Sequence, residues 1–412
     1  MSRRPFLGPT LALAVLVCGF AAPTLAAPPT RNLLVEPGFE ATRPGHSWMP
    51  VGWDTSSSSL PTVFFGRDTA LSRAGRYAVS VANVSTLIPY WHNWSQTLVV
   101  GPEMWNKDVV FTAWTRSNGV QGRGYILVHA VRDTVGKMTR IWSVSRDSAR
   151  ARLGISPLED PYVYLGAKRA YFSEPETDWV KRQVRVYVPP STNLIIVRCG
   201  IFGTGQVFFD EASLTAETAL PPAELPVGMN LLQDPGFEGD GNSWEYSLPP
   251  YEEVACERET TVVHSGKASV RLGGGLAATI KTRAGAVKVI DNRSLAGKRL
   301  RFTAWAKCDS LTSPAYLKLF CTTHRQNEVP GPTPRVLTNS TPWTQLELEA
   351  DVPDDTYMVW AWLEYQAPAS GRVYFDDASL EILGPARSKG PSSSTKRAPA
   401  RKSGSSKATT PP

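Results

Sequence analysis

The sequence predicts an all-β protein made of two tandem β-sandwich domains, and two observations support this. The nine residues of Asn32–Glu40 (NLLVEPGFE) recur as Asn230–Glu238 (NLLQDPGFE), and each copy opens a segment that ends on a shared phrase, FFDEASL at Leu214 or YFDDASL at Leu380. Such an internal repeat indicates two homologous units. Between the phrases, short alternating runs broken by Gly, Pro and Ser show no helical period, which is typical of strands.

The length and charge of the chain limit its class. A chain of 412 residues is longer than one core normally serves. The net charge of +7 comes from the two ends, because the stretch 385–412 carries seven Lys and Arg residues without an acid and Arg3 and Arg4 add two more. The remainder has a net charge of −2, which argues against a specific nucleic-acid partner.

The N-terminus is typical of an export signal. Arg3 and Arg4 precede an apolar run over 6–22, and small residues suit cleavage after Ala26. The run is too short for a membrane span. We expect a secreted, periplasmic or cell-surface protein, exported by general secretion rather than by the twin-arginine route that the pair of arginines also resembles.

The domain organisation follows from aligning the two copies. We expect a signal peptide at 1–26, a first module at 27–215, a Pro/Ala-rich linker at 216–228, a second module at 229–384 and a disordered basic tail at 385–412. Two interpretations of the tail stay open: it binds anionic envelope polymers through its positive charge, or it is only a solvated end.

The first module carries an insertion that the second lacks. It holds 27 extra residues within about 117–178, many of them basic or aromatic. Two interpretations stay open: the insertion gives the first module a different partner, or it is an extra hairpin that covers a sheet edge.

The cysteines suggest no metal site. Cys199 aligns with Leu363, so it is interpreted as a buried thiol in place of an aliphatic side chain. Cys308 and Cys321 end neighbouring predicted strands, and a disulfide between them is one alternative.

Alternation along two predicted strands of the second module separates core from surface. Leu300, Phe302, Ala304, Ala306 and Cys308 share one face, and Val359, Ala361 and Leu363 do the same in the strand 358–365. If the two strands lie side by side, their other faces form an aromatic platform edged by charge, made of Trp305, Lys307, Trp360, Trp362 and Glu364. Such a surface suits sugars, whose C–H faces are apolar and whose rims are hydroxyls.

The equivalent face of the first module is less aromatic. Its candidates are Trp114, Arg116, Arg198, Tyr125 and His129, with Trp91 and Trp94 as further aromatic side chains that compensate. Trp114 and Trp305 recur in both copies, so both a framework role and a ligand role stay open for them.

Together these motifs resemble carbohydrate-binding modules of the cellulase-C type, families four and nine, which are jelly rolls of the galactose-binding-like group. The shared frame comprises the NLL and PGFE phrase, the segments SRAGRYAVSV and HSGKASVRL, the FTAW strand and the closing FDDASL. The resemblance covers nearly all of both modules. It implies two jelly rolls that bind polysaccharide or another glycan, without identifying the glycan.

The resemblance also implies a structural calcium ion in each module. The carboxylates in question are Glu40 with Asp210 and Glu238 with Asp376. Paired carboxylates beside backbone carbonyls suit a hard cation. The alternative is that these side chains only accept hydrogen bonds from backbone N–H groups; a catalytic carboxylate pair is a weaker third interpretation.

The sequence therefore predicts an exported, non-catalytic carbohydrate-binding protein that assists glycan hydrolysis by a partner or acts alone. It contains no G-x-S-x-G elbow, metal-binding His pair, CxxC or Gly-rich phosphate loop. Two other classes stay open: a structural or adhesive envelope protein that uses the same fold for protein contacts, and a polysaccharide-degrading enzyme such as a lyase.

Overall fold

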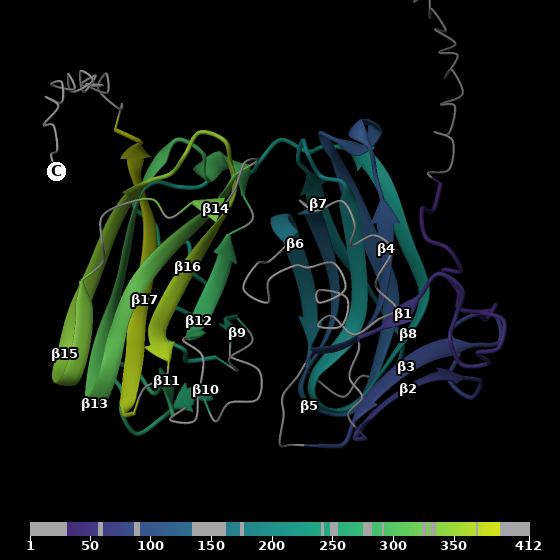
Figure 1. Cartoon of the computed structure of the whole chain (residues 1–412), viewed down its shortest axis with the longest axis horizontal. Helices are drawn as coiled ribbons and strands as arrows, with labels where there is room; N and C mark the ends of the chain where they lie inside the picture. The colour runs from purple at the N-terminus through teal and green to yellow at the C-terminus, as the bar shows by residue number, and fades with distance from the viewer. Residues whose placement is uncertain are drawn as a thin grey trace, which may run out of the picture.

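The structure is a computed structural model that describes residues 31–56, 61–85, 91–133, 162–173, 177–239, 243–247, 254–274, 282–290, 292–323, 327–328, 330, 335–367 and 370–387. Within these ranges the regular structure is β-strand apart from two short 3-10 turns, η1 (Pro102–Met104) and η3 (Arg293–Leu295). Figure 1 shows two sandwiches side by side, the first purple to teal and the second green to yellow. The all-β, two-module prediction is confirmed. The predicted signal peptide and the tail beyond residue 387 lie outside the described residues.

The first module is an antiparallel jelly-roll sandwich whose two sheets share long strands. Its strands are β1 (Asp54–Thr55), β2 (Val63–Asp68), β3 (Ala78–Asn83), β4 (Trp91–Val99), β5 (Lys107–Asp133), β6 (Tyr162–Phe172), β7 (Val180–Val188) and β8 (Leu194–Thr218). The first half of β5 pairs with β7 and the second half of β8, and its second half pairs with β6 and the first half of β8. We call β2-β3-β8-β5-β7 the outer sheet and β1-β4-β8-β5-β6 the inner sheet.

The second module repeats this plan. Its strands are β9 (Glu245–Ser247), β10 (Val254–Glu259), β11 (Ser269–Gly274), β12 (Thr282–Ile290), β13 (Lys298–Thr323), β14 (Asn327–Glu328), β15 (Val336–Asp351), β16 (Thr356–Ala367) and β17 (Arg372–Pro385). The outer sheet is β10-β11-β17-β13-β15, which uses the first half of β13, and the inner sheet is β9-β12-β16-β13, which uses its second half. The two inner sheets face each other in Figure 1. Strand β6 lies close to β13 and β16.

The change of sheet within β5 depends on glycine. The pairing of β5 with β8 shifts register between Asn118 and Gln121, and Gly122 has a φ of +116°. An added Cβ at Gly122 would lie 2.2 Å from the carbonyl oxygen of Phe202, and one at Gly203 would lie 2.1 Å from that of Gln121. Since the two backbones touch where both strands bend, a side chain at either glycine would force them apart.

Each sandwich closes over one main core. The alternation read from the sequence is confirmed, because the inward residues of both halves of β13 and of β16 are buried in the same cluster. Cys199 is buried in the first core, as predicted. Cys308 and Cys321 lie on the two halves of the single strand β13, and the four described cysteines are free, so the disulfide interpretation is wrong.

The repeated opening and closing phrases meet in space. The side-chain oxygen of Asn32 accepts hydrogen bonds from the N–H groups of Leu34 (3.1 Å) and Leu214 (3.0 Å), and its amide donates to the carbonyl of Ala212 (3.1 Å). Asn230 makes the same three contacts in the second module, with Leu232 (3.0 Å), Leu380 (3.0 Å) and Ala378 (2.9 Å). We call this contact the asparagine clip; it joins the first residues of each module to its last strand.

Strand β6 of the insertion contacts the second module, and the linker is bonded to it. Of the insertion, the structure describes the second half of β5 and the strand β6, which forms the edge of the inner sheet; the stretch 134–161 lies outside the described residues. In the linker, the carbonyls of Leu220 and Ala223 accept hydrogen bonds from Arg293 (2.8 Å) and Asn292 (3.0 Å) of the second module. The linker is therefore held in place rather than loose. None of the helices in the described part of the chain has the length and apolar character needed to cross a membrane.

We expect the asparagine clip to be a main determinant of stability. Replacing Asn230 by Ala removes three hydrogen bonds and leaves the N–H of Leu380 without its acceptor, which should lower the free energy of unfolding by about 2–4 kcal/mol. Calorimetry of the mature chain should show a lower melting temperature. Lys267→Ala, an exposed side chain in the same module, is the control. A melting temperature equal to that of the control would contradict the role of the clip.

Candidate functional site

The predicted platform of the second module is divided between two sheets. Trp305 and Lys307 lie on the first half of β13, which pairs with β17 and β15, whereas Trp360, Trp362 and Glu364 lie on β16, which pairs with the second half of β13. The prediction that these five side chains form one surface is wrong. The reason is that β13 changes sheet between its halves, so outward positions on the two halves point to opposite sides of the sandwich.

The candidates of the first module divide in the same way. Trp114 and Arg116 lie on the outer sheet, where they pair with Asp210 and Phe208 of β8. Tyr125 and His129 lie on the second half of β5 and share the inner sheet with Arg198 of β8. The structure therefore brings the last three together and separates them from the first two.

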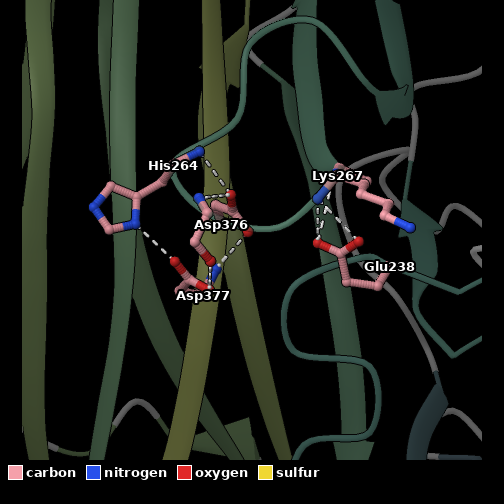
Figure 2. A network of polar contacts seen from close by, with 7 residues as sticks. Glu238, His264, Lys267, Asp376 and Asp377 are labelled. Atoms are coloured by element: carbon pink, nitrogen blue, oxygen red, sulfur yellow. Dashed lines mark hydrogen bonds and ion pairs between the residues drawn. The ribbon is translucent and has the colours of Figure 1, made fainter.

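The recurring tryptophans of the outer sheets support the framework around the closing phrase. The ring of Trp305 stacks on His264 with centroids 4.0 Å apart, and Nδ1 of His264 lies 2.7 Å from Oδ2 of Asp377 (Figure 2). In the first module Arg73 lies over Trp114 at 4.4 Å and pairs with Glu211 at 3.9 Å. A cationic or imidazole side chain thus covers the tryptophan in each copy, so the geometry favours the framework role.

The carboxylates predicted to bind calcium accept backbone N–H groups. In the second module Oδ2 of Asp376 accepts from the N–H groups of His264 (2.8 Å) and Ser265 (3.1 Å). Oε1 of Glu238 accepts from the N–H group of Lys267 (2.8 Å), and Figure 2 shows this bond and that of His264. The aspartate is fully buried, and burial raises its pKa although the N–H groups lower it.

The first module has the same arrangement. Oδ2 of Asp210 accepts from the N–H groups of Arg73 (2.7 Å) and Ala74 (3.0 Å), and Oε1 of Glu40 accepts from those of Arg76 (2.9 Å) and Tyr77 (3.1 Å). Both carboxylates line a hollow of about 410 Å³.

These contacts bear on the calcium prediction. Among the described residues no group of three or more His, Cys, Asp or Glu side chains is placed to hold a metal ion. Each of these carboxylates is surrounded by N–H groups, which point positive hydrogens at it and offer no electron pairs to a calcium ion. The surroundings of the carboxylates therefore fit hydrogen bonding better than calcium binding. Calcium stays a prediction, which thermal unfolding with and without a chelator tests: a bound ion requires a lower melting temperature on chelation, and N–H acceptance alone requires none.

The inner face of the first module holds a cluster of four aromatic rings. The centroid of Trp91 lies 4.9 Å from that of Tyr125, 4.7 Å from that of Phe202 and 6.4 Å from that of Tyr171. Gly200 leaves room for the hydroxyl of Tyr125, because an added Cβ at this glycine would lie 2.6 Å from that oxygen. Trp91, Phe202 and Tyr171 are partly exposed, whereas Tyr125 is 1% exposed. We call these four residues the aromatic cluster.

Three arginines accompany the aromatic cluster. Arg123 lies 4.8 Å from the ring centroid of Tyr171, and Arg169 lies 5.7 Å from that of Trp91. Arg198 neighbours Tyr125 and His129 across the sheet. Burial lowers the pKa of His129 well below its ordinary value, and the charges of Arg198 and Arg169 lower it further. The histidine is 5% exposed and uncharged at neutral pH. It is therefore a buried residue beneath this face rather than part of the exposed surface.

The inner face of the second module is also aromatic and holds a lysine beside its tryptophans. Trp360 and Trp362 of β16 lie beside Phe320 and Lys318 of β13, and both tryptophans are partly exposed. Glu364 is 1% exposed and accepts a hydrogen bond from the hydroxyl of Tyr316 (2.6 Å). It is therefore a buried acceptor at the end of this face rather than a charged rim.

Sequence reasoning missed several residues of these faces. Arg123 continues the alternation of Tyr125 and His129, so the pattern on β5 contained it. Tyr171 and Phe202 lie on strands whose outward faces were not followed. Trp94, considered as a compensating surface residue, is buried in the core and donates to the carbonyl of Ser80 (2.9 Å).

Comparison with known proteins gave structural matches alone. No protein-family model and no curated protein matches the chain. Among solved structures, the tandem CBM22-1–CBM22-2 domains of Paenibacillus barcinonensis Xyn10C match with a TM-score of 0.30 and 15% identity, over 87% of this chain and 99% of that one. A family 22 carbohydrate-binding module of Clostridium thermocellum Xyn10B matches with a TM-score of 0.30 and 16% identity, over 40% of this chain and 100% of that one.

A third match is an apo cyclase from Fischerella sp., with a TM-score of 0.31 and 18% identity, over 46% of this chain and 97% of that one. The carbohydrate-binding modules named here belong to family 22, not to families four and nine. With scores of this size, the fold assignment rests on the strand topology itself.

We expect the first module to lose stability in mild acid. Burial lowers the pKa of His92, which is 1% exposed, to about 4. The unfolded chain takes up this proton near pH 6.5, so unfolding is favoured as the pH falls from about 6.5 towards 4, by up to about 1.4 kcal/mol per pH unit. Urea unfolding at pH 7 and pH 5 measures the difference.

The histidine variants separate this effect from the rest of the protein. His92→Gln should show a smaller loss between the two pH values than the wild type. His46→Gln removes an exposed imidazole of the same module and should behave like the wild type. Equal losses in all three proteins would contradict the assignment to His92.

Proposed function

We propose that the chain binds polysaccharide on the inner faces of its two modules and does not itself cleave it. The observation that carries the proposal is the aromatic cluster, in which partly exposed rings of Trp91, Phe202 and Tyr171 lie beside arginines on a sheet face. Aromatic rings bind the apolar faces of sugars, and guanidinium groups donate hydrogen bonds to the hydroxyl rim.

The expected affinity is modest for each face. A sugar stacked on one tryptophan buries about 80 Å² of apolar surface, worth about 2 kcal/mol. Two or three such contacts, less the cost of association, give dissociation constants on the order of millimolar to micromolar. Two modules on one polymer chain then gain by avidity.

The finer parts of the proposal come from the sequence. The signal-like N-terminus supports export to the periplasm, the cell surface or the medium. The motif resemblance supports a module of the cellulase-C type, and the basic tail supports contact with anionic envelope polymers. Tail deletion followed by envelope binding at low and high salt tests the last point.

The binding faces can be tested with tryptophan variants. Trp91→Ala in the first module and the double variant Trp360→Ala/Trp362→Ala in the second should each weaken binding to a polysaccharide array, by about 10-fold or more for the affected module. Trp305→Ala, on the outer sheet, is the matched control and should keep wild-type binding once its folding is checked by calorimetry. Loss of binding in the folded control alone would move the site to the outer sheet.

The absence of catalysis is tested on the same polymers. Incubation should release no shorter chains and no unsaturated sugars. If unsaturated products appear and His129→Ala abolishes them, the chain is a lyase and the non-catalytic part of the proposal is wrong. If no glycan binds to the folded wild type, the fold serves protein contacts instead.

A further inference from the structure

The second module places a carboxylate against the aromatic cluster of the first. Glu245 of β9 forms an ion pair with Arg169, and its Oε1 atom lies 3.4 Å from the hydroxyl of Tyr171. Next to it, the carbonyl of Trp244 accepts from both terminal nitrogens of Arg123, each at 3.4 Å. One arginine and one tyrosine of the first module thus converge on an acidic residue of the second, and a second arginine binds the carbonyl of the residue before it.

This contact is largely removed from solvent. The side chain of Arg169 is 16% exposed and that of Glu245 is 20% exposed. Burial and the charge of Glu245 raise the pKa of Tyr171, so its hydroxyl stays a donor at neutral pH. Because a buried guanidinium without a partner is costly, Arg169 needs an anion at this position.

The groups beside Glu245 are held more firmly than its side chain. Trp244 is fully buried in the second core, and its ring nitrogen donates to the carbonyl of Asp234 (2.9 Å). The backbone of Trp244 is therefore fixed, and so is the contact of its carbonyl with Arg123. The Glu245 side chain lies at the edge of a three-residue strand that pairs with β12 alone among the described strands, so it can turn towards solvent without unfolding either sandwich.

From this geometry we infer that the first module recognises an acidic sugar, a uronate, whose carboxylate replaces that of Glu245 on Arg169 and Tyr171. The inference rests on the proposed glycan-binding function and names its substrate class. A neutral sugar that displaced Glu245 would leave Arg169 buried without a counter-charge, whereas a uronate restores the ion pair while its ring stacks on Trp91. Glu245 is then an internal competitor that selects against neutral chains at this position.

The experiment measures binding of the mature full-length protein to oligogalacturonate and to a neutral galactan oligosaccharide of equal length. Glu245→Gln removes the competing charge and keeps the shape of the side chain. Its affinity for oligogalacturonate should rise by about 10-fold or more over the wild type, and its affinity for the neutral oligosaccharide should change less. Arg169→Gln in the same assay should lose most of the oligogalacturonate binding.

A matched control separates the local effect from net charge. Glu257→Gln makes the same charge change on β10 of the outer sheet, at a side chain that is 49% exposed, and should leave both affinities at wild-type values. A Glu245→Gln protein that binds oligogalacturonate no more tightly than the Glu257→Gln protein overturns the inference. If Trp91-dependent binding of the neutral oligosaccharide persists in that case, the proposed function stands; if all folded variants bind neither probe, both fail.

Discussion

Each module depends on the asparagine clip. A jelly roll starts with an irregular segment that has no sheet partner of its own, and its last strand runs through the middle of a sheet. One asparagine satisfies two N–H groups and one carbonyl between these segments, in both modules and at nearly equal distances. Because the donor and acceptor positions are fixed by the backbone, a different residue type would leave at least one of these groups unsatisfied. This requirement explains why the opening and closing phrases are the parts that the two copies share most closely.

The second constraint is that a single strand serves both sheets. When β5 or β13 passes from the outer to the inner sheet, its inward residues stay in one core but its outward residues change sides of the molecule. The tryptophans near the clip, Trp114 and Trp305, therefore end on the outer sheets under Arg73 and His264. The inner faces obtain their aromatic rings from the second halves of these strands and from β4, β6, β8 and β16, so they can differ between the copies.

This constraint also decides what the sequence could predict. A period of two identifies core and surface along a strand, and the buried positions of β13 and β16 follow it. The period does not say where a strand changes sheet, so the alternation placed Trp305 beside Trp360. Gly119 and Gly122, close together in β5, were the available signal of a bend in the first module, whereas β13 contains no glycine. The contact of Glu245 with Arg169 joins residues 76 positions apart in different modules, and no local pattern contains it.

The two copies have diverged in the surfaces that meet between them. The first module has the eleven-residue strand β6, which brings Arg169 and Tyr171 to the edge of its inner sheet, and the second module supplies the acid that these residues contact. The linker is tied to the second module through Arg293 and Asn292. A duplicated fold thus carries in one copy a cationic aromatic face and in the other the carboxylate that occupies it. Since a fixed neighbour competes at high effective concentration, only a ligand that offers both an anion and a ring to stack can replace it efficiently.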